Sequence, residues 1–124
     1  MKAAEEGRLP IIIQVYSRLL NEEVDYYIYS AIVVAVRKLT VSICINLDHG
    51  ATELEVQKPL RWGATGIMYN GSVHSFDKNV ENTKHILGIC ECIYVSAKSA
   101  IGHVVSLNDV MDDFTYPAEE AENS

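Results

Sequence analysis

An aspartate and a histidine stand side by side in this sequence, at Asp48 and His49, directly after the apolar stretch 41–47. A carboxylate can carry a proton to or from a hydroxyl group, and an imidazole can bind a metal ion that polarises a carbonyl group. The two side chains together therefore suit carbonyl chemistry. Gly50 follows them and would permit a tight turn.

The pair must be positioned by a buried strand, because residues 41–47 form a short apolar run rich in β-branched residues. In a parallel α/β sheet the carboxyl ends of the strands open onto the ligand crevice, so Asp48 and His49 would face a site there. Comparable runs occur at residues 11–16, 66–69 and 93–97. The segments between the four runs have the length and capping residues of helices, and they span residues 26–39, 52–61 and 76–90.

Strands and helices thus alternate, in units of about thirty residues, which is typical of right-handed crossovers and a parallel sheet. Two architectures fit, a doubly wound sheet and part of a (β/α)8 barrel, and the pattern does not separate them. No G-x-G-x-x-G follows the first strand, so nothing supports dinucleotide binding. We expect one domain over residues 1–124, with its core in 10–103 and an acidic, weakly ordered tail over 104–124.

Composition excludes several classes of protein. The chain has 124 residues, of which 48% are hydrophobic, enough for a real core. Its net charge of -7 argues against a nucleic-acid partner, because binding of phosphate backbones requires clustered basic side chains. No apolar run approaches the roughly 20 residues that span a bilayer. Acidic residues occupy the start of the chain, where a secretion signal would be apolar, so we expect a cytoplasmic protein.

The three cysteines agree with a reducing compartment. Cys44 is expected to be a small buried hydrophobe, and Cys90 and Cys92 to pack where a helix meets a strand. Their C-x-C spacing has no second pair, so it does not predict structural zinc.

Several sequence motifs occur in a fixed order along the chain. LDHG at 47–50 is followed by G-x-x-x-I-M-x-x-G-S at 63–72, by F-x-x-N-x-x-x-T-K at 76–84, by YVSAKSAIG at 94–102 and by FTYPAEEA at 114–121. From about residue 4 to about residue 122 the chain resembles the class II, zinc-dependent ketose-bisphosphate aldolases, which include the fructose-bisphosphate and tagatose-bisphosphate enzymes.

The resemblance implies a (β/α)8 TIM barrel, of which this chain would form about four parallel strands. It implies zinc-dependent, reversible cleavage of fructose or tagatose bisphosphate to dihydroxyacetone phosphate and glyceraldehyde 3-phosphate. Asp48 would shuttle the proton of the sugar hydroxyl and His49 would be a zinc ligand. Asn70, Gly71 and Ser72 would lie on the substrate side, where backbone N–H groups ahead of a helix could meet a phosphate.

The chain also departs from the family pattern. Asn70 stands where the family has an aspartate, and Ser96 and Lys98 stand where it has two glutamates. A complete barrel needs about 250 residues and eight strands, and catalytic zinc typically has three protein ligands. Two further zinc-binding histidines of the family belong to a later part of its barrel. We therefore expect the isolated chain to be inactive unless a second copy or another chain completes the barrel.

Other interpretations stay open. The chain could be a non-catalytic relative or an assembly subunit that acts through protein–protein contacts, or an incomplete piece of a longer protein. Asp48 could simply cap a helix or end a turn. His74 and His103 could join His49 in a rebuilt three-histidine site, although solvated loop histidines are the plainer interpretation. His85 is expected on a helix surface.

Overall fold

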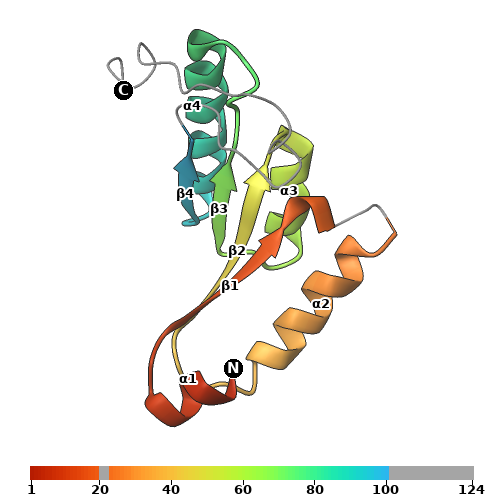
Figure 1. The fold of residues 1–124 in the computed structure, drawn as a ribbon, viewed down its shortest axis with the longest axis vertical. Helices are drawn as coiled ribbons and strands as arrows, with labels where there is room; N and C mark the ends of the chain where they lie inside the picture. The colour runs from red at the N-terminus through yellow and green to blue at the C-terminus, as the bar shows by residue number, and fades with distance from the viewer. Residues whose placement is uncertain (20–22, 101–124) are drawn as a thin grey trace, which may run out of the picture.

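A four-stranded parallel sheet with helices between its strands forms the centre of the molecule (Figure 1). The computed structural model describes residues 1–19 and 23–100, so the predicted tail and His103 lie outside the described residues. The elements are α1 (Lys2–Gly7), β1 (Ile11–Tyr16), the 3-10 helix η1 (Ser17–Leu19), α2 (Asp25–Val36), β2 (Ile43–Gly50), α3 (Glu53–Arg61), β3 (Gly66–Tyr69), α4 (Phe76–Cys92) and β4 (Ser96–Ser99).

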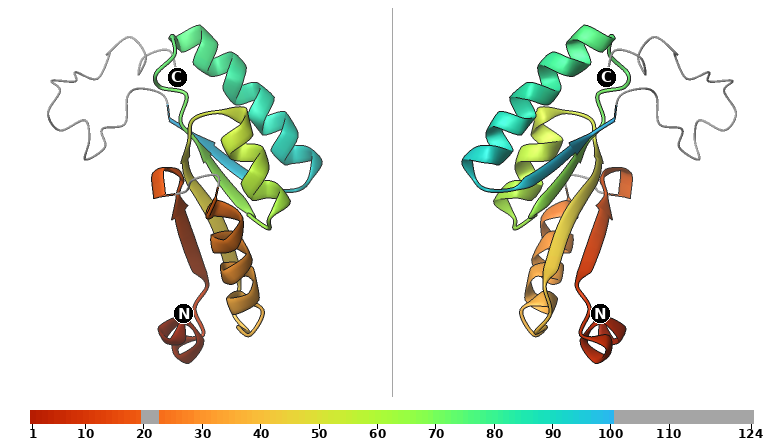
Figure 2. Two further views of the ribbon diagram at one scale, coloured as in Figure 1. Left: turned by 90° about the vertical axis from the view of Figure 1, so that its right-hand side faces the viewer. Right: turned by 90° about the vertical axis from the view of Figure 1, so that its left-hand side faces the viewer.

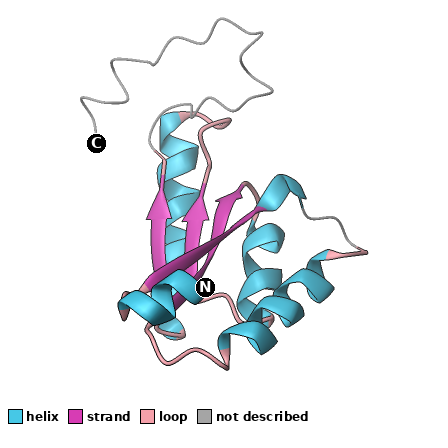
Figure 3. Ribbon diagram, turned by 60° about the horizontal axis from the view of Figure 1, so that its bottom comes forward, coloured by secondary structure: helices cyan, strands magenta, loops and turns pink. Residues whose placement is uncertain are grey.

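The order of the strands separates the two architectures that the sequence left open. Each strand pairs in parallel with the next, in the order β1-β2-β3-β4. Figure 2 shows α2, α3 and α4 on the same face of the sheet. A doubly wound sheet would reverse its strand order and place helices on both faces. The arrangement is therefore that of consecutive βα units of a barrel, with the right-handed twist seen in the rotation of β1 against β3 and β4 (Figure 3).

The core lies between the sheet and these helices. Leu47 and Ile67 face each other across β2 and β3, and neither is exposed to solvent. Tyr29 from α2 is equally buried, and its hydroxyl has no hydrogen-bond partner among the residues that the structure describes. Burial, helped by the nearby charge of Asp25, raises the pKa of that phenol. The buried core residues are Val15, Tyr29, Ile45, Leu47, Val56, Ala64, Ile67, Tyr69, Ile86 and Cys90.

The opposite face of the sheet is not covered by any helix of the described part of the chain (Figure 2). Its side chains are mixed in polarity and include a cross-strand hydrogen bond of 2.5 Å from Asn46 Nδ2 to Gln14 Oε1. Gly66 makes room for this contact, because a Cβ there would lie 2.7 Å from Asn46 Oδ1. In a complete barrel this face would be the interior.

Helix α3 begins with a capping box formed by Thr52 and Glu55. Thr52 Oγ1 accepts a hydrogen bond of 3.2 Å from the Glu55 backbone N–H, and Glu55 Oε2 accepts one of 2.7 Å from the Ala51 N–H. Pro59 stands near the end of this helix, where a proline predicts a broken or shortened last turn. It lies buried inside the helix instead, and the helix continues to Arg61.

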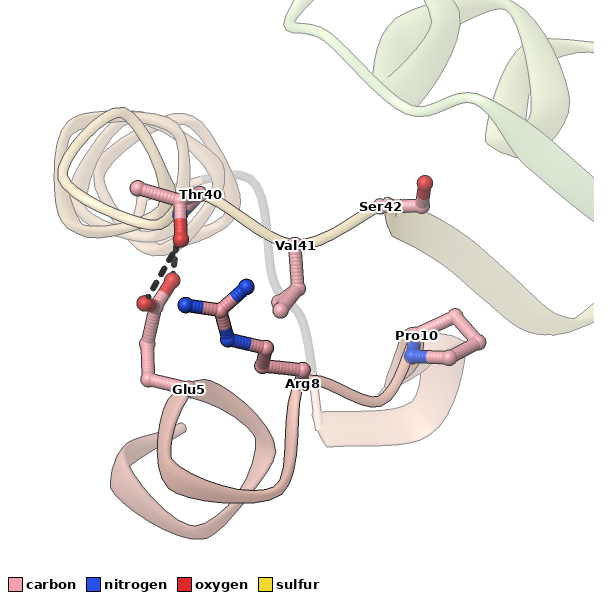
Figure 4. A pocket seen from close by; sticks show the side chains of 6 residues that line it. All are labelled: Glu5, Arg8, Pro10, Thr40, Val41 and Ser42. Carbon is pink, nitrogen blue, oxygen red and sulfur yellow. Dashed lines mark hydrogen bonds between the residues drawn. The ribbon is translucent and has the colours of Figure 1, made fainter.

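Helix α1 was not predicted, and it packs at the amino ends of the strands, away from Asp48 (Figure 1). The Glu5 carboxylate accepts hydrogen bonds from the backbone N–H and the hydroxyl of Thr40 (Figure 4), the latter at 2.9 Å. The backbone hydrogen bond is the main cause that lowers the pKa of Glu5. These bonds tie the start of the chain to the loop that enters β2.

Several boundaries differ from those predicted. Helix α2 ends at Val36, and α4 runs on to Cys92, whose side chain is exposed and does not pack as expected. Tyr94 then turns the chain with a φ of 57°, so β4 begins at Ser96 and not at residue 93. Cys90 is buried as predicted, whereas Cys44 is only partly buried. Among the described residues, no helix has the length and apolar character needed to cross a membrane.

Candidate active site

Asp48 and His49 lie inside strand β2, which continues to Gly50, and not in a turn after it. The pairing of β2 with β3 shifts here, because Leu47 pairs with Ile67 and Gly50 pairs with Tyr69. Three steps along β2 thus match two along β3, as in a β-bulge. Bulges redirect side chains near the ends of strands and are frequent beside active sites.

The bulge is built on His49, whose φ is 60°. Ser17 Oγ donates a hydrogen bond of 2.7 Å to the His49 carbonyl oxygen and holds this backbone in place. Gly50 was expected to supply the unusual backbone conformation, but it does not have a positive φ. A glycine is needed there for packing instead, because a Cβ would lie 2.7 Å from Leu47 Cδ2.

The imidazole of His49 is enclosed by three neighbours. The Tyr16 ring meets it edge to face, with ring centroids 5.6 Å apart and an interplanar angle of 82°. Asp48 Oδ1 lies 3.9 Å from Nε2. Asn70 Nδ2 lies 3.3 Å from Nδ1. Both Asp48 and His49 stay partly exposed to solvent, so a ligand could reach them.

Asn70 follows β3 and links that strand end to β2. Its backbone N–H donates a 2.8 Å hydrogen bond to the Gly50 carbonyl oxygen. Its side-chain Oδ1 accepts hydrogen bonds from the Ser72 backbone N–H at 3.2 Å and from Ser72 Oγ at 2.6 Å. The structure thus brings Asp48, His49, Asn70 and Ser72 together at the carboxyl edge of the sheet.

Other candidate residues stay apart from this group. Gly71 is buried, and the space beside it is filled by Tyr69 and Asn79. His74 is exposed and lines a separate groove of about 190 Å³ between α3 and α4. His85, exposed as predicted, lines the same groove, and its Nε2 lies 3.0 Å from Glu53 Oε2.

The two residues that replace family glutamates occupy different levels of the sheet. Ser96 pairs with Gly66 at the first residue of β3, so it lies below the carboxyl edge. Lys98 pairs with Met68, one residue before the end of β3, and its side chain is exposed. Lys98 therefore brings a positive charge close to the edge, and Ser96 does not reach it.

Zinc does not fit the donor set that the described residues bring together. No three side chains of the types His, Cys, Asp and Glu in residues 1–19 and 23–100 are grouped so that they could hold a metal ion. Among the described residues at the carboxyl edge, His49 and Asp48 are the ones of these types, and Asn70 presents its amide nitrogen to the imidazole. Catalytic zinc typically takes three protein ligands.

Tyr16 and Ser17 belong to the site, although sequence reasoning did not select them. They stand at the end of β1 and just after it, and Tyr16 pairs with Asp48 in the sheet register. Their position in the sequence could have indicated this role, because polar side chains at the carboxyl ends of parallel strands tend to meet. The contacts themselves depend on the pairing of β1 with β2.

Comparison with known proteins agrees with this geometry. The family model described as "Fructose-bisphosphate aldolase class-II" matches residues 1–123. This chain belongs to the class II fructose-bisphosphate aldolase family. The fold is accordingly a partial (β/α)8 barrel, with four parallel strands in its described part.

Individual relatives show how far the similarity extends. The chain is 25% identical over 122 residues to the sulfofructosephosphate aldolase of Alkalicoccus urumqiensis, covering 98% of this chain and 42% of that protein. It is 31% identical over 103 residues to the fructose-bisphosphate aldolase of Giardia intestinalis, covering 82% of this chain and 32% of that protein.

A solved structure is similar as well, that of a putative fructose-1,6-biphosphate aldolase from Coccidioides immitis. Its TM-score is 0.73 at 22% identity, covering 85% of this chain and 37% of that one. The chain thus spans about two fifths of the length of these relatives or less.

Proposed function

We propose that this chain is a unit of a class II aldolase-type barrel, that Asp48 is its proton carrier, and that it does not cleave fructose or tagatose bisphosphate by itself. The observation that carries the proposal is the carboxyl edge of the sheet. It presents one partly exposed carboxylate beside one imidazole, without a cluster of metal donors in the described residues.

Aldol cleavage makes two separate chemical demands. A base must take the proton from a sugar hydroxyl while the neighbouring carbon–carbon bond breaks, and a partly exposed Asp48 at a strand end suits that step. The electron pair left beside the carbonyl group must also be stabilised by a positive charge or a metal ion. Zinc supplies that stabilisation in the family, but the described donor set does not hold it.

The activity test compares the purified chain with its Asp48→Ala variant. Each is incubated with zinc and fructose or tagatose bisphosphate, and release of dihydroxyacetone phosphate is followed by a coupled enzyme. We expect both proteins to give the rate of the zinc-only blank. The fructose-bisphosphate aldolase of Giardia intestinalis serves as the positive control for the assay.

Release by the unaltered chain above the rate of Asp48→Ala would contradict the proposed inactivity. It would leave the assignment of Asp48 as proton carrier intact, because that variant would then be the slower one. If the unaltered chain and Asp48→Ala gave equal rates above the blank, Asp48 would not be the proton carrier.

A second candidate function is assembly, and the uncovered sheet face favours it. No helix of the described residues covers that face, and Ile12 on it has 62% of its surface exposed. Among the described strands, β1 and β4 each have one edge without a partner strand. Unpaired edges are places where further strands can add. We infer that a second copy of the chain associates with this face and with these strand edges.

Sedimentation equilibrium tests this assembly. The chain should associate as its concentration rises, and Ile12→Glu should reduce that association. Val34→Glu is the matched control, because Val34 is 59% exposed but belongs to helix α2 on the covered face. A monomer at every concentration would exclude self-association, and equal effects of both variants would place the contact elsewhere.

We also place this function in the cytoplasm. The three cysteines are free thiols, and Cys92 is exposed. Thiols of this kind persist in the reducing environment of the cytosol.

A further inference from the structure

We propose that Asn70 and Ser72 hold His49 in the tautomer that carries its proton on Nε2, so that neither ring nitrogen offers a lone pair to a metal ion. The imidazole then acts as a hydrogen-bond donor beside Asp48. This inference concerns the state of one side chain, and it goes beyond the proposed function because it does not depend on whether the chain cleaves a sugar.

The backbone determines the orientation of the Asn70 side-chain amide. A peptide N–H can only donate, so the Asn70 atom 3.2 Å from the Ser72 N–H must be the oxygen, Oδ1. Ser72 Oγ donates to the same oxygen at 2.6 Å. Turning the amide over would place its NH2 group against a peptide N–H, and both groups would then be donors.

The nitrogen end of this amide determines which ring nitrogen of His49 carries the proton. With Oδ1 held by Ser72, the NH2 group of Asn70 faces His49 Nδ1 at 3.3 Å. An amide NH2 group has only hydrogens to offer, so Nδ1 must accept and cannot carry a hydrogen itself. A neutral imidazole has one N–H, and that N–H is therefore on Nε2.

A negatively charged carboxylate lies beside Nε2. Asp48 Oδ1 lies 3.9 Å from this nitrogen, which is too long for a direct hydrogen bond but short enough for electrostatic attraction. A negative oxygen favours an N–H over a lone pair on the adjacent nitrogen. The carboxylate of Asp48 and the amide of Asn70 thus favour the same tautomer from opposite sides of the ring.

The ring is also held in position. Ser17 Oγ fixes the His49 carbonyl oxygen at 2.7 Å, and the Tyr16 ring packs edge to face against the imidazole. The Asn70 backbone N–H donates a 2.8 Å hydrogen bond to the Gly50 carbonyl oxygen, which fixes the Asn70 main chain beside β2, and Ser72 holds the side-chain oxygen of Asn70. The contact between Asn70 and His49 is therefore built into the pairing of the two strand ends.

The consequence for metal binding is direct. A metal ion binds a histidine nitrogen through its lone pair, and the other nitrogen then normally donates its hydrogen to an acceptor. In this chain Nδ1 faces a donor, so moving the proton there would bring N–H groups into contact. The pair of Nε2–H and Asp48 carboxylate instead suits a hydroxyl group, which can accept from one and donate to the other.

The tautomer is measured on the unaltered chain by a long-range ¹H–¹⁵N correlation spectrum of its ¹⁵N-labelled histidines. At about pH 8, where an ordinary histidine is neutral, His49 should show a protonated Nε2 and an unprotonated Nδ1. Comparison with the spectrum of His49→Gln assigns the signals. Addition of one equivalent of zinc should leave both His49 nitrogens unshifted.

Asn70→Asp reverses the hydrogen bond, because a carboxylate accepts from Nδ1 and leaves the Nε2 lone pair exposed. Zinc affinity read at the His49 nitrogens should rise by about tenfold or more. Ser72→Ala is the matched control, because it keeps the backbone N–H that orients Asn70 and should keep the original tautomer.

Two results would overturn the inference, a protonated Nδ1 in the unaltered chain or a zinc-induced shift of its His49 nitrogens. Both are read without any variant, so a substitution that fails to fold does not affect them. The cleavage assay measures a different property, and failure of the proposed inactivity is therefore distinguishable from failure of this inference.

Discussion

Replacing Leu47 with alanine is expected to lower the free energy of unfolding by about 3 kcal/mol. Leu47 is fully buried in β2, where it pairs with Ile67 and packs beside Gly50. Truncation removes apolar contacts and leaves a cavity between the sheet and its helices. Urea denaturation followed by circular dichroism measures the loss.

Leu54→Ala is the control, because Leu54 is 58% exposed on α3 and the same atoms are removed from a solvated position. Its effect should stay within about 0.5 kcal/mol. If the two variants unfold at the same urea concentration, the core does not lie between β2, β3 and the helices as described.

Replacing Gly71 with alanine is expected to lower the free energy of unfolding by about 2 kcal/mol, because the site has no room for a methyl group. A Cβ at Gly71 would run into Asn79 Oδ1 and would lie 2.7 Å from Tyr69 Cε1. Asn79 also donates a 3.0 Å hydrogen bond to the Ala100 carbonyl oxygen, so the displacement would reach the end of β4.

The same substitution at Gly88 should change the free energy of unfolding in the opposite direction. Gly88 lies inside α4, and no atom of the described residues outside the helix backbone lies within 4 Å of a Cβ built there. Alanine is favoured over glycine in a helix interior by about 1 kcal/mol, so Gly88→Ala should raise the free energy of unfolding. Equal destabilisation by both variants would show that the packing around Gly71 is not responsible for its loss.

Much of the fold follows from the sequence because it depends on local patterns. The strands at 11–16 and 66–69 are short, nearly continuous apolar runs with clear ends, and the structure confirms both. Thr52 and Glu55 cap α3 through atoms only a few residues apart. The gathering of Asp48 and Asn70 at one edge follows from parallel strands alone, which is why that part of the site could be predicted.

The remaining features depend on contacts between distant segments. Residues 93–95 have strong strand preferences, yet β4 is the polar stretch Ser96–Ser99, because pairing with β3 determines which residues are used. Helix α1 is held by Glu5 through Thr40, 35 residues later in the chain. The residues around each of these segments in the sequence do not indicate which distant segment it will contact.

The hydrogen bonding of His49 likewise depends on contacts between distant segments and could not be predicted from the local sequence. Its place beside an acid was visible in the sequence, and the family resemblance suggested a metal ligand. Its hydrogen-bond partner depends on a bulge in β2 and on the Ser72 backbone N–H, which orients the side-chain amide of Asn70. No local pattern encodes which nitrogen of the ring accepts.

The carboxyl edge of this sheet is proposed to hold a proton carrier and not a metal centre. A zinc-edge anomalous difference map from crystals of the chain grown with zinc would reveal a metal ion there. We expect no anomalous peak at coordination distance, about 2.1 Å, from either ring nitrogen of His49. A peak at that distance would contradict the claim.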